Sequence, residues 1–222
     1  MSFIIPTILS SDIEEVQEKA CQLKGLTDWL HLDIMDGLFV PEKTVSLDQL
    51  KKINSLKEFK LGLHLMVENP VQFLGGAEEL GTKRVLVHVE AVVDQFALLQ
   101  EIKSRGMEAG LVLDLKSGKE KIQPAAWPLM KVVLVMMVRA GQGGQELQKR
   151  RLTVVENLKD WRQKKGFNFK IGVDGGVNQQ TISACFQAGA DILAVGSAIW
   201  KASNPGRAIE ELNNLVKKRR QD

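Results

Sequence analysis

Short apolar runs alternate along this chain with longer segments of helical periodicity, and this pattern most constrains the fold. The alternation occurs eight times in 222 residues, which is one unit in about 28 residues (222/8). The apolar runs are apolar nearly throughout, as is typical of parallel strands covered on their outer face. We expect strands at residues 3–9, 29–35, 60–66, 84–89, 109–113, 132–138, 169–173 and 192–195.

The segments between these runs predict one helix per unit. The expected helices span residues 13–23, a least clear one within 47–53, then 70–80, 91–105, a short one interrupted by Pro124 and Pro128, 146–164, 179–189 and 205–219. Eight such units close into a (β/α)8 TIM barrel, so we expect an α/β fold with a single barrel domain over residues 1–222. The alternative is a doubly wound open sheet. Such a sheet usually has a glycine-rich phosphate loop after its first strand. This chain has Ile8-Leu9-Ser10-Ser11-Asp12 there, without a glycine.

Charge and composition narrow the class of partner. The net charge is only +3, and the basic run at 217–220 is typical of a solvated last helical turn, so we expect no nucleic acid partner. No apolar stretch approaches membrane-span length, so we expect no membrane partner. Cys21 and Cys185 have no partner at metal spacing. These features predict a reduced, cytoplasmic protein.

Polar side chains interrupt the predicted strands where a barrel carries its chemistry. His31 and Asp33 stand two residues apart in the second strand and therefore share a face. His64 and His88 lie in the next two strands, and Asp174 lies at the carboxyl end of the seventh. Each histidine alone is compatible with a core role held by a neighbour. We assign His88 to the core or to support of a site.

Buried carboxylates are costly unless they are paired or bound to a cation. Lys and Arg are absent from the last few residues of strands two, three and seven, so a divalent metal is the natural counter-charge for Asp33 and Asp174. The set His31, Asp33, His64 and Asp174 contains two imidazoles and two carboxylates. It suits zinc, iron(II), manganese or cobalt, and is too rich in nitrogen for calcium or magnesium.

Glycines follow three neighbouring strands, in Gly141-Gln142-Gly143-Gly144, Gly175-Gly176 and Gly196-Ser197. Such loops allow backbone N–H groups to converge on an anion, and barrel phosphate sites are often built after strands seven and eight. Tight turns alone explain any single loop, but three together favour phosphate. A metal, two carboxylates and a phosphate cradle suit a phosphorylated sugar whose carbonyl the metal polarises while the carboxylates move a proton.

Seven motifs, in order along nearly the whole chain, give a family resemblance. They read PTILSSD, HLDIMDGLFVP, LHLMVENP, VHVEA, VLVMMVRAGQGGQ, VDGGVN and ADILAVGSAIW. The chain resembles the ribulose-phosphate 3-epimerase family, whose members are ribulose-phosphate binding barrels. The resemblance implies a metal on His31, Asp33, His64 and Asp174, with Asp33 and Asp174 as the catalytic acid and base.

The same resemblance implies the reaction and the substrate contacts. D-ribulose 5-phosphate would become D-xylulose 5-phosphate by inversion at C3, through an enediolate whose charge the metal holds. Phosphate would lie on the three glycine loops, with Thr7 and His64 as further substrate contacts. Met35, Met66 and Met136 would line the pocket, although core filling explains each as well. A homo-oligomer, first of all a dimer, is expected by resemblance.

Several positions depart from the family pattern. Leu38 and Glu42 replace a histidine and an asparagine, Asp114 replaces an asparagine, and the loop at 137–144 gains Arg139 and Gln142. Arg139 could contact substrate, but a surface salt bridge is favoured. These changes leave open a 3-epimerase of another ketose phosphate, such as allulose 6-phosphate, or a non-catalytic sugar-phosphate-binding barrel. An aldolase or decarboxylase is disfavoured, since the Asp-x-Lys-x-x-Asp pattern is absent at strands two and three.

Overall fold

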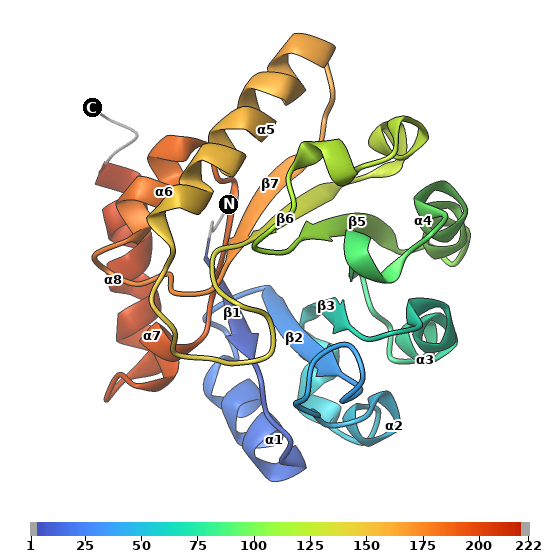
Figure 1. The fold of residues 1–222 in the computed structure, drawn as a ribbon. Coiled ribbons are helices and arrows are strands. Elements are labelled where there is room, and N and C mark those ends of the chain that lie inside the picture. Colours follow the sequence, from blue (N-terminus) through green and yellow to red (C-terminus); the bar gives the residue numbers. More distant parts are fainter. Residues whose placement is uncertain (1–3, 219–222) are drawn as a thin grey trace.

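Eight parallel strands form a closed barrel in the computed structural model, which describes residues 4–218 (Figure 1). The strands follow one another in chain order, and β1 pairs with both β2 and β8. This closure confirms the (β/α)8 prediction and excludes the open sheet. The strands are β1 (Ile4–Ile8), β2 (Trp29–Met35), β3 (Lys60–Met66), β4 (Arg84–His88), β5 (Glu108–Leu113), β6 (Val132–Met136), β7 (Lys170–Asp174) and β8 (Ile192–Val195).

Helices cover the outside of the barrel. They are α1 (Ile13–Gln22), α2 (Leu47–Leu50), α3 (Leu74–Glu79), α4 (Gln95–Ser104), α5 (Leu152–Lys165), α6 (Ile182–Ala188), α7 (Ser197–Trp200) and α8 (Pro205–Lys218). Between β5 and β6 the connection is built from 3-10 turns, including η5 (Pro124–Leu129), as the two prolines of that segment predicted.

Several helices begin later than the periodicity predicts, and for α5 and α4 the local reason is visible. Residues 146–148 are not helical, because this loop returns to the barrel and the Gln148 N–H donates to the Met137 carbonyl. Helix α5 therefore starts at Leu152. Helix α4 starts at Gln95 because the Asp94 side chain accepts a hydrogen bond from the Ala97 N–H and caps the helix.

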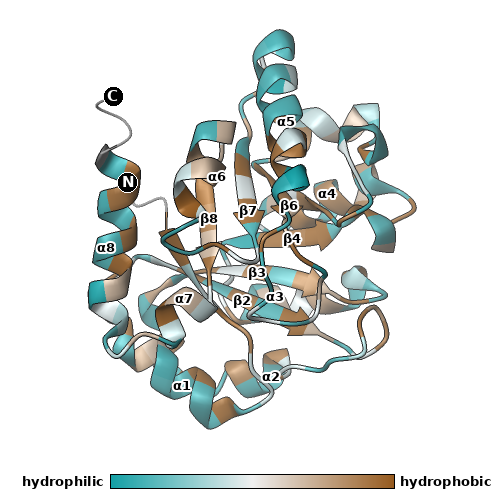
Figure 2. Cartoon of the chain, turned by 60° about the vertical axis from the view of Figure 1, so that its left-hand side comes forward, coloured by the Kyte–Doolittle hydropathy of each residue, from teal (hydrophilic) through white to brown (hydrophobic). Residues whose placement is uncertain are grey.

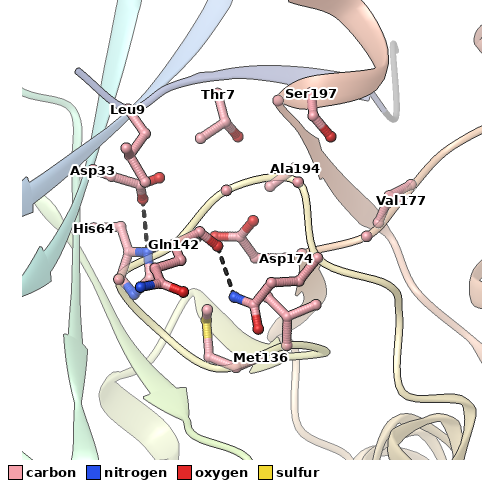
Figure 3. Close-up of a pocket in the computed structure, with 18 of the residues that line it drawn as sticks. Thr7, Leu9, Asp33, His64, Met136, Gln142, Asp174, Val177, Ala194 and Ser197 are labelled. Carbon is pink, nitrogen blue, oxygen red and sulfur yellow. Dashed lines mark hydrogen bonds and ion pairs between the residues drawn. The ribbon is translucent and has the colours of Figure 1, made fainter. Parts of the chain in front are cut away.

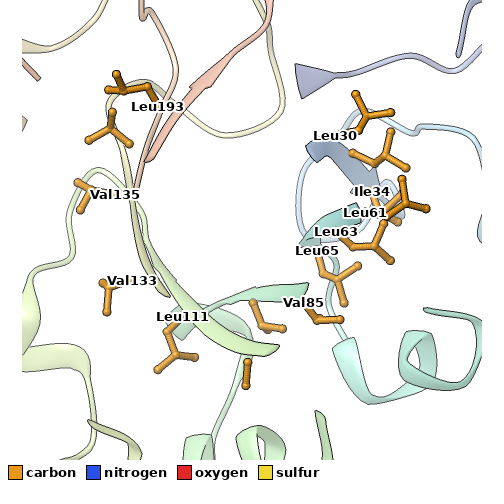
Figure 4. Close-up of a cluster of buried hydrophobic side chains, with 14 of the residues drawn as sticks. Leu30, Ile34, Leu61, Leu63, Leu65, Val85, Leu111, Val133, Val135 and Leu193 are labelled. Atoms are coloured by element: carbon orange, nitrogen blue, oxygen red, sulfur yellow. The ribbon is translucent and has the colours of Figure 1, made fainter. Parts of the chain in front are cut away.

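The two-residue period of β2 separates apolar residues that face the helices from polar residues that face the barrel interior. Leu30, Leu32 and Ile34 of β2 are buried between the strands and the helices, where they join the main hydrophobic core (Figure 4). His31 and Asp33, which alternate with them, point into the barrel. Figure 2 shows hydrophobic residues along the strands and hydrophilic ones on the outer helix faces.

Side chains fill the barrel interior from the amino-terminal ends of the strands toward their carboxyl ends. The Arg84 guanidinium lies 2.6 Å from a Glu108 carboxylate oxygen and 4.1 Å from the centre of the Trp29 ring at that end. A small apolar cluster containing Leu86 and Leu134 lies inside the barrel. Space for a ligand is therefore left at the carboxyl ends of the strands.

Other features of the described residues concern the surface. No helix within residues 4–218 is long and apolar enough to cross a membrane. Of the basic run at 217–220, Lys217 is exposed near the end of α8, while Arg219 and Arg220 lie outside the described residues. Both cysteines are free thiols, with Cys21 exposed and Cys185 buried.

Candidate active site

Two histidines and two aspartates meet near the carboxyl ends of β2, β3 and β7. Figure 3 shows three of them, Asp33, His64 and Asp174. One ligand atom from each of His31, Asp33, His64 and Asp174 lies within 4.8 Å of the other three. The register of the sheet places Asp33 directly beside His64, so two neighbouring strands deliver an imidazole and a carboxylate to one point. Asp174 comes from β7, on the other side of β1 and β8.

The distances within this cluster are those of direct contact. The His64 Nδ1–H donates to Asp33 Oδ1 at 2.9 Å, and the same nitrogen lies 3.5 Å from Asp174 Oδ2. The His31 Nε2 lies 3.3 Å from Asp33 Oδ1 and 3.7 Å from Asp174 Oδ2. The two carboxylates thus face one another across a pair of imidazoles.

Electrostatics couples these groups strongly. Burial alone would raise the pKa of Asp33, but the His31 and His64 imidazoles beside it hold that pKa well below its usual range. Burial also disfavours a charged His64, yet Asp174 and Asp33 overcome this effect and raise the pKa of His64 to about 9. In the metal-free protein at neutral pH, His64 is therefore an imidazolium that serves as counter-charge.

The same donors fit a divalent cation. Among residues 4–218, Asp33 and Asp174 form ion pairs only with His31 and His64, and no Lys or Arg neutralises them. His31 Nε2 is fully buried without a hydrogen bond. An unsatisfied buried nitrogen aimed at two carboxylates is the arrangement that a nitrogen- and oxygen-binding metal would satisfy.

A line of buried side chains continues from His64 to the next strand. The His64 Nε2 lies 2.9 Å from the His88 Nε2, and the His88 Nδ1 lies 3.4 Å from Glu90 Oε2. Burial lowers the pKa of His88, so this ring is neutral and accepts from His64. Glu90 is in turn hydrogen-bonded by the Ser117 hydroxyl. His88 thus fixes which His64 nitrogen faces the two aspartates.

A cavity of about 310 Å³ opens above this cluster, and all of the predicted substrate residues line it (Figure 3). They are Thr7, His64, Gly141, Gln142, Gly143, Gly144, Gly175, Gly176, Gly196 and Ser197. The two glycines after β7 are required by the backbone. Gly175 and Gly176 have φ values of 98° and 69°, and a Cβ on Gly176 would lie 2.4 Å from the Leu147 nitrogen.

The three methionines do not behave alike. Met66 and Met136 line the cavity, whereas Met35 does not. Met35 shares a strand face with Asp33, and it packs in the small apolar cluster that also contains Met66 and Met136. Met35 is 4% exposed, as Met136 is, so its burial does not separate it from the other two, and its lining role stays a prediction.

Thr7 keeps a hydroxyl available for a ligand. Its Oγ1 is buried in the cavity wall without a hydrogen-bond partner. The Trp200 indole N–H donates to the Thr7 carbonyl at 2.6 Å and ties the residues after β8 to β1. The hydroxyl and the glycine loop at Gly196-Ser197 therefore form one continuous wall.

Sequence reasoning missed two cationic residues at this site. Lys19 of α1 and Lys201, directly after α7, line the cavity beside Trp200. Nothing in their sequence spacing marks them, because both reach the cavity through the packing of helices. Arg139 also lines it, and no ion pair involves Arg139 within residues 4–218, so the predicted surface salt bridge is absent.

Most departures from the family pattern gather beside the cavity. Glu42, Asp114, Arg139 and Gln142 all line a second cavity of about 410 Å³, which shares Arg139 and Gln142 with the first. The Gln142 amide donates to Glu42 Oε1 at 2.8 Å and joins the loops after β6 and β2. Leu38 is exposed. The changes therefore alter one side of the mouth and leave the His–Asp cluster unchanged.

This chain is similar to ribulose-phosphate 3-epimerases over nearly its whole length. A family model described as the Ribulose-phosphate 3 epimerase family matches residues 3–200. The cytoplasmic isoform of ribulose-phosphate 3-epimerase from Oryza sativa is 35% identical, over 96% of this chain and 93% of the relative. Ribulose-phosphate 3-epimerase from Bacillus subtilis is 32% identical, over 94% of this chain and 97% of the relative.

Solved structures agree on the architecture. The crystal structure of KGPDC from Streptococcus mutans superposes with a TM-score of 0.73 at 14% identity, covering 98% of each chain. At this identity the likeness supports the barrel fold alone.

Proposed function

The chain belongs to the ribulose-phosphate 3-epimerase family and is an epimerase, and from this premise we propose that it converts D-ribulose 5-phosphate to D-xylulose 5-phosphate. The observation that carries the proposal is the pair of buried carboxylates, Asp33 and Asp174, which come from different sides of the barrel and meet at one cavity. Inversion at a carbon needs an acid and a base on opposite faces, and this pair supplies them.

Asp33 and Asp174 would share the proton transfer at C3. One carboxylate, ionised, removes the C3 proton from one face of the ketose phosphate. The other, protonated, delivers a proton to the opposite face, and the two exchange roles when the reaction runs backward. A bound divalent cation (zinc, iron(II), manganese or cobalt) on His31, Asp33, His64 and Asp174 would supply positive charge next to the negative charge that forms on the sugar.

The rest of the cavity would hold and orient the substrate. Backbone N–H groups of the loops at 141–144, 175–176 and 196–197 would bind the phosphate, and the free Thr7 hydroxyl would bind a sugar oxygen. Met66 and Met136 would give the reacting carbons an apolar surface that excludes water. Fixing both ends of the sugar holds C3 between the two carboxylates.

Solvent exchange at C3 tests this proposal. The protein, loaded in turn with each of the four metals, is incubated with D-ribulose 5-phosphate in deuterium oxide and C3 is followed by NMR. We expect deuterium at C3 together with xylulose 5-phosphate, and loss of both after chelation. Sugar phosphate binding without exchange for any ketose phosphate would instead identify a non-catalytic binding barrel.

A six-carbon ketose phosphate is the second candidate substrate. The cavity beside Glu42, Asp114 and Arg139 supports it, because carboxylates and a guanidinium there could bind the additional hydroxyl groups of a longer sugar. The same deuterium exchange experiment with allulose 6-phosphate tests this candidate, and the sugar with the higher kcat/KM is the better substrate.

We also propose a cytoplasmic location, following the name of the Oryza sativa relative. A homodimer is proposed as the first candidate assembly, and light scattering after size exclusion tests it.

A further inference from the structure

Three cationic side chains line the catalytic cavity, and they differ in what they contact. Lys19 is already neutralised. Its Nζ lies 2.6 Å from Glu15 Oε1 and 5.2 Å from the centre of the Trp200 ring. The pKa of Glu15 is lowered by hydrogen bonds from Lys19 and Ser10, which is consistent with a formed ion pair. Lys19 therefore has little charge left to offer a ligand.

Arg139 belongs to the loop after β6, and no ion pair involves it within residues 4–218. It forms part of the wall shared with the second cavity, where Glu42 and Asp114 are also lining residues. The two carboxylates in the lining of that cavity disfavour a phosphate dianion there. The charge of Arg139 is thus partly offset by these carboxylates and is less available to balance a phosphate.

Lys201 differs from both. Within residues 4–218 its ammonium group takes part in no ion pair and no hydrogen bond. It directly follows Ser197–Trp200, the single helical turn after β8, and its Nζ lies 3.6 Å from the position that a Cβ would take at Gly144. One unpaired ammonium group therefore lies between the loop after β6 and the loop after β8.

This position matters because the predicted phosphate cradle is otherwise uncharged. The loops at 141–144, 175–176 and 196–197 offer backbone N–H groups and one hydroxyl, whereas a phosphate monoester carries nearly two negative charges at neutral pH. The carboxylates Asp33 and Asp174 at the floor of the same cavity repel it. A cation at the rim would offset that repulsion.

We propose that Lys201 is a phosphate-binding residue of this site, whose ammonium group completes the glycine cradle and makes the cavity select phosphate esters over uncharged sugars. The identity of the sugar rests on the proposed function, but the affinity for inorganic phosphate does not.

The test compares Lys201→Met with Lys201→Arg and with Lys131→Met. Lys131 is exposed and precedes β6 at the opposite end of the barrel, so its substitution removes the same charge far from the cavity. Direct binding of inorganic phosphate is measured by calorimetry, its competitive inhibition constant and the KM for ribulose 5-phosphate are measured by kinetics, and affinity for unphosphorylated ribulose is measured in parallel.

We expect Lys201→Met to weaken phosphate binding and raise the KM by about tenfold or more, as loss of one charge-assisted hydrogen bond does. Lys201→Arg restores most of the affinity, Lys131→Met stays within about twofold of the parent, and binding of unphosphorylated ribulose does not change. Lys201 also borders a hollow of about 360 Å³ outside α7. If the side chain stays on that side, phosphate affinity is unchanged in Lys201→Met, and the proposal is overturned.

Failure of this proposal and failure of the proposed reaction are distinguishable. Parental turnover with unchanged phosphate affinity in Lys201→Met, or an Arg139→Met variant that loses phosphate affinity in its place, refutes the role of Lys201 alone. An inactive parent whose phosphate affinity still depends on Lys201 supports this residue and refutes the reaction.

Discussion

Metal binding to this site should release a proton from His64, and the size of the effect follows from the geometry. Asp33 and Asp174 raise the pKa of His64 to about 9 in the metal-free protein. The proton on Nδ1 faces both carboxylates, and a metal must replace it. Below this pKa the apparent affinity should rise by about tenfold per pH unit, and above it the affinity should become constant.

At pH 7, about two pH units below the pKa of His64, nearly every His64 side chain carries this proton, and metal binding must remove it. The apparent affinity should therefore lie about 100-fold below its maximum, which corresponds to about 2.7 kcal/mol. Calorimetric titration with Mn²⁺ measures this in two buffers of different ionisation enthalpy, at several pH values from 6.5 to 8.5. The observed enthalpy should depend on the buffer with a slope of about one proton per metal.

His64→Asn is the matched variant for this titration. It should bind Mn²⁺ more weakly, with no buffer-dependent proton release from this position and a flatter pH profile. A parent protein whose affinity is constant from pH 6.5 to 8.5, with no proton released, would refute the reasoning. His64 would then be neutral in the metal-free protein, and the two carboxylates would not raise its pKa as the distances indicate.

Three further predictions concern residues around the site. His88→Asn removes the ring 2.9 Å from His64 Nε2 and should weaken metal affinity by about 10- to 100-fold in competition with a chelator, while the fold is retained. Arg151→Met removes a buried guanidinium that donates to the carbonyls of four other residues. It should lower the free energy of unfolding, measured by urea denaturation, by about 3–5 kcal/mol. The control Arg150→Met, at an exposed residue, should change it by less than about 0.5 kcal/mol. Gly176→Ala places a Cβ 2.4 Å from the Leu147 nitrogen at φ 69°, so it should displace this loop and raise the KM for the sugar phosphate; an unchanged KM would show that this loop does not bind the phosphate.

The strands could be predicted because their signal is local. Buried parallel strands are continuous apolar runs, and seven of the eight predicted runs end within one residue of the observed strands. The run at 132–138 is longer than β6, which ends at Met136, because Met137 and Val138 are also buried but belong to the loop. Helix starts were less predictable, since the return of Gln148 to the barrel depends on a distant carbonyl.

The His–Asp cluster could be predicted because its geometry follows from the strand period and the barrel closure. Spacing of two residues puts His31 and Asp33 on one face, and closure brings Asp174 to them. Lys201 could not be predicted as a lining residue, because its place depends on how the segment after β8 packs at the mouth of the cavity. Arg151, within a basic segment, reads as solvent-exposed, yet it is 5% exposed and binds backbone carbonyls.

The central claim is that Asp33 and Asp174 act on opposite faces of C3, and single-carboxylate variants test it most directly. Asp33→Asn and Asp174→Asn keep an amide oxygen as a metal ligand but lose the acid–base group. Each variant is incubated in deuterium oxide with ribulose 5-phosphate and, separately, with xylulose 5-phosphate. It should still exchange the C3 hydrogen of one epimer for deuterium without inverting that carbon. The two variants should retain exchange in opposite epimers. If both variants exchange the same epimer, or if either still interconverts the two sugars at the parental rate, the two-carboxylate account is wrong.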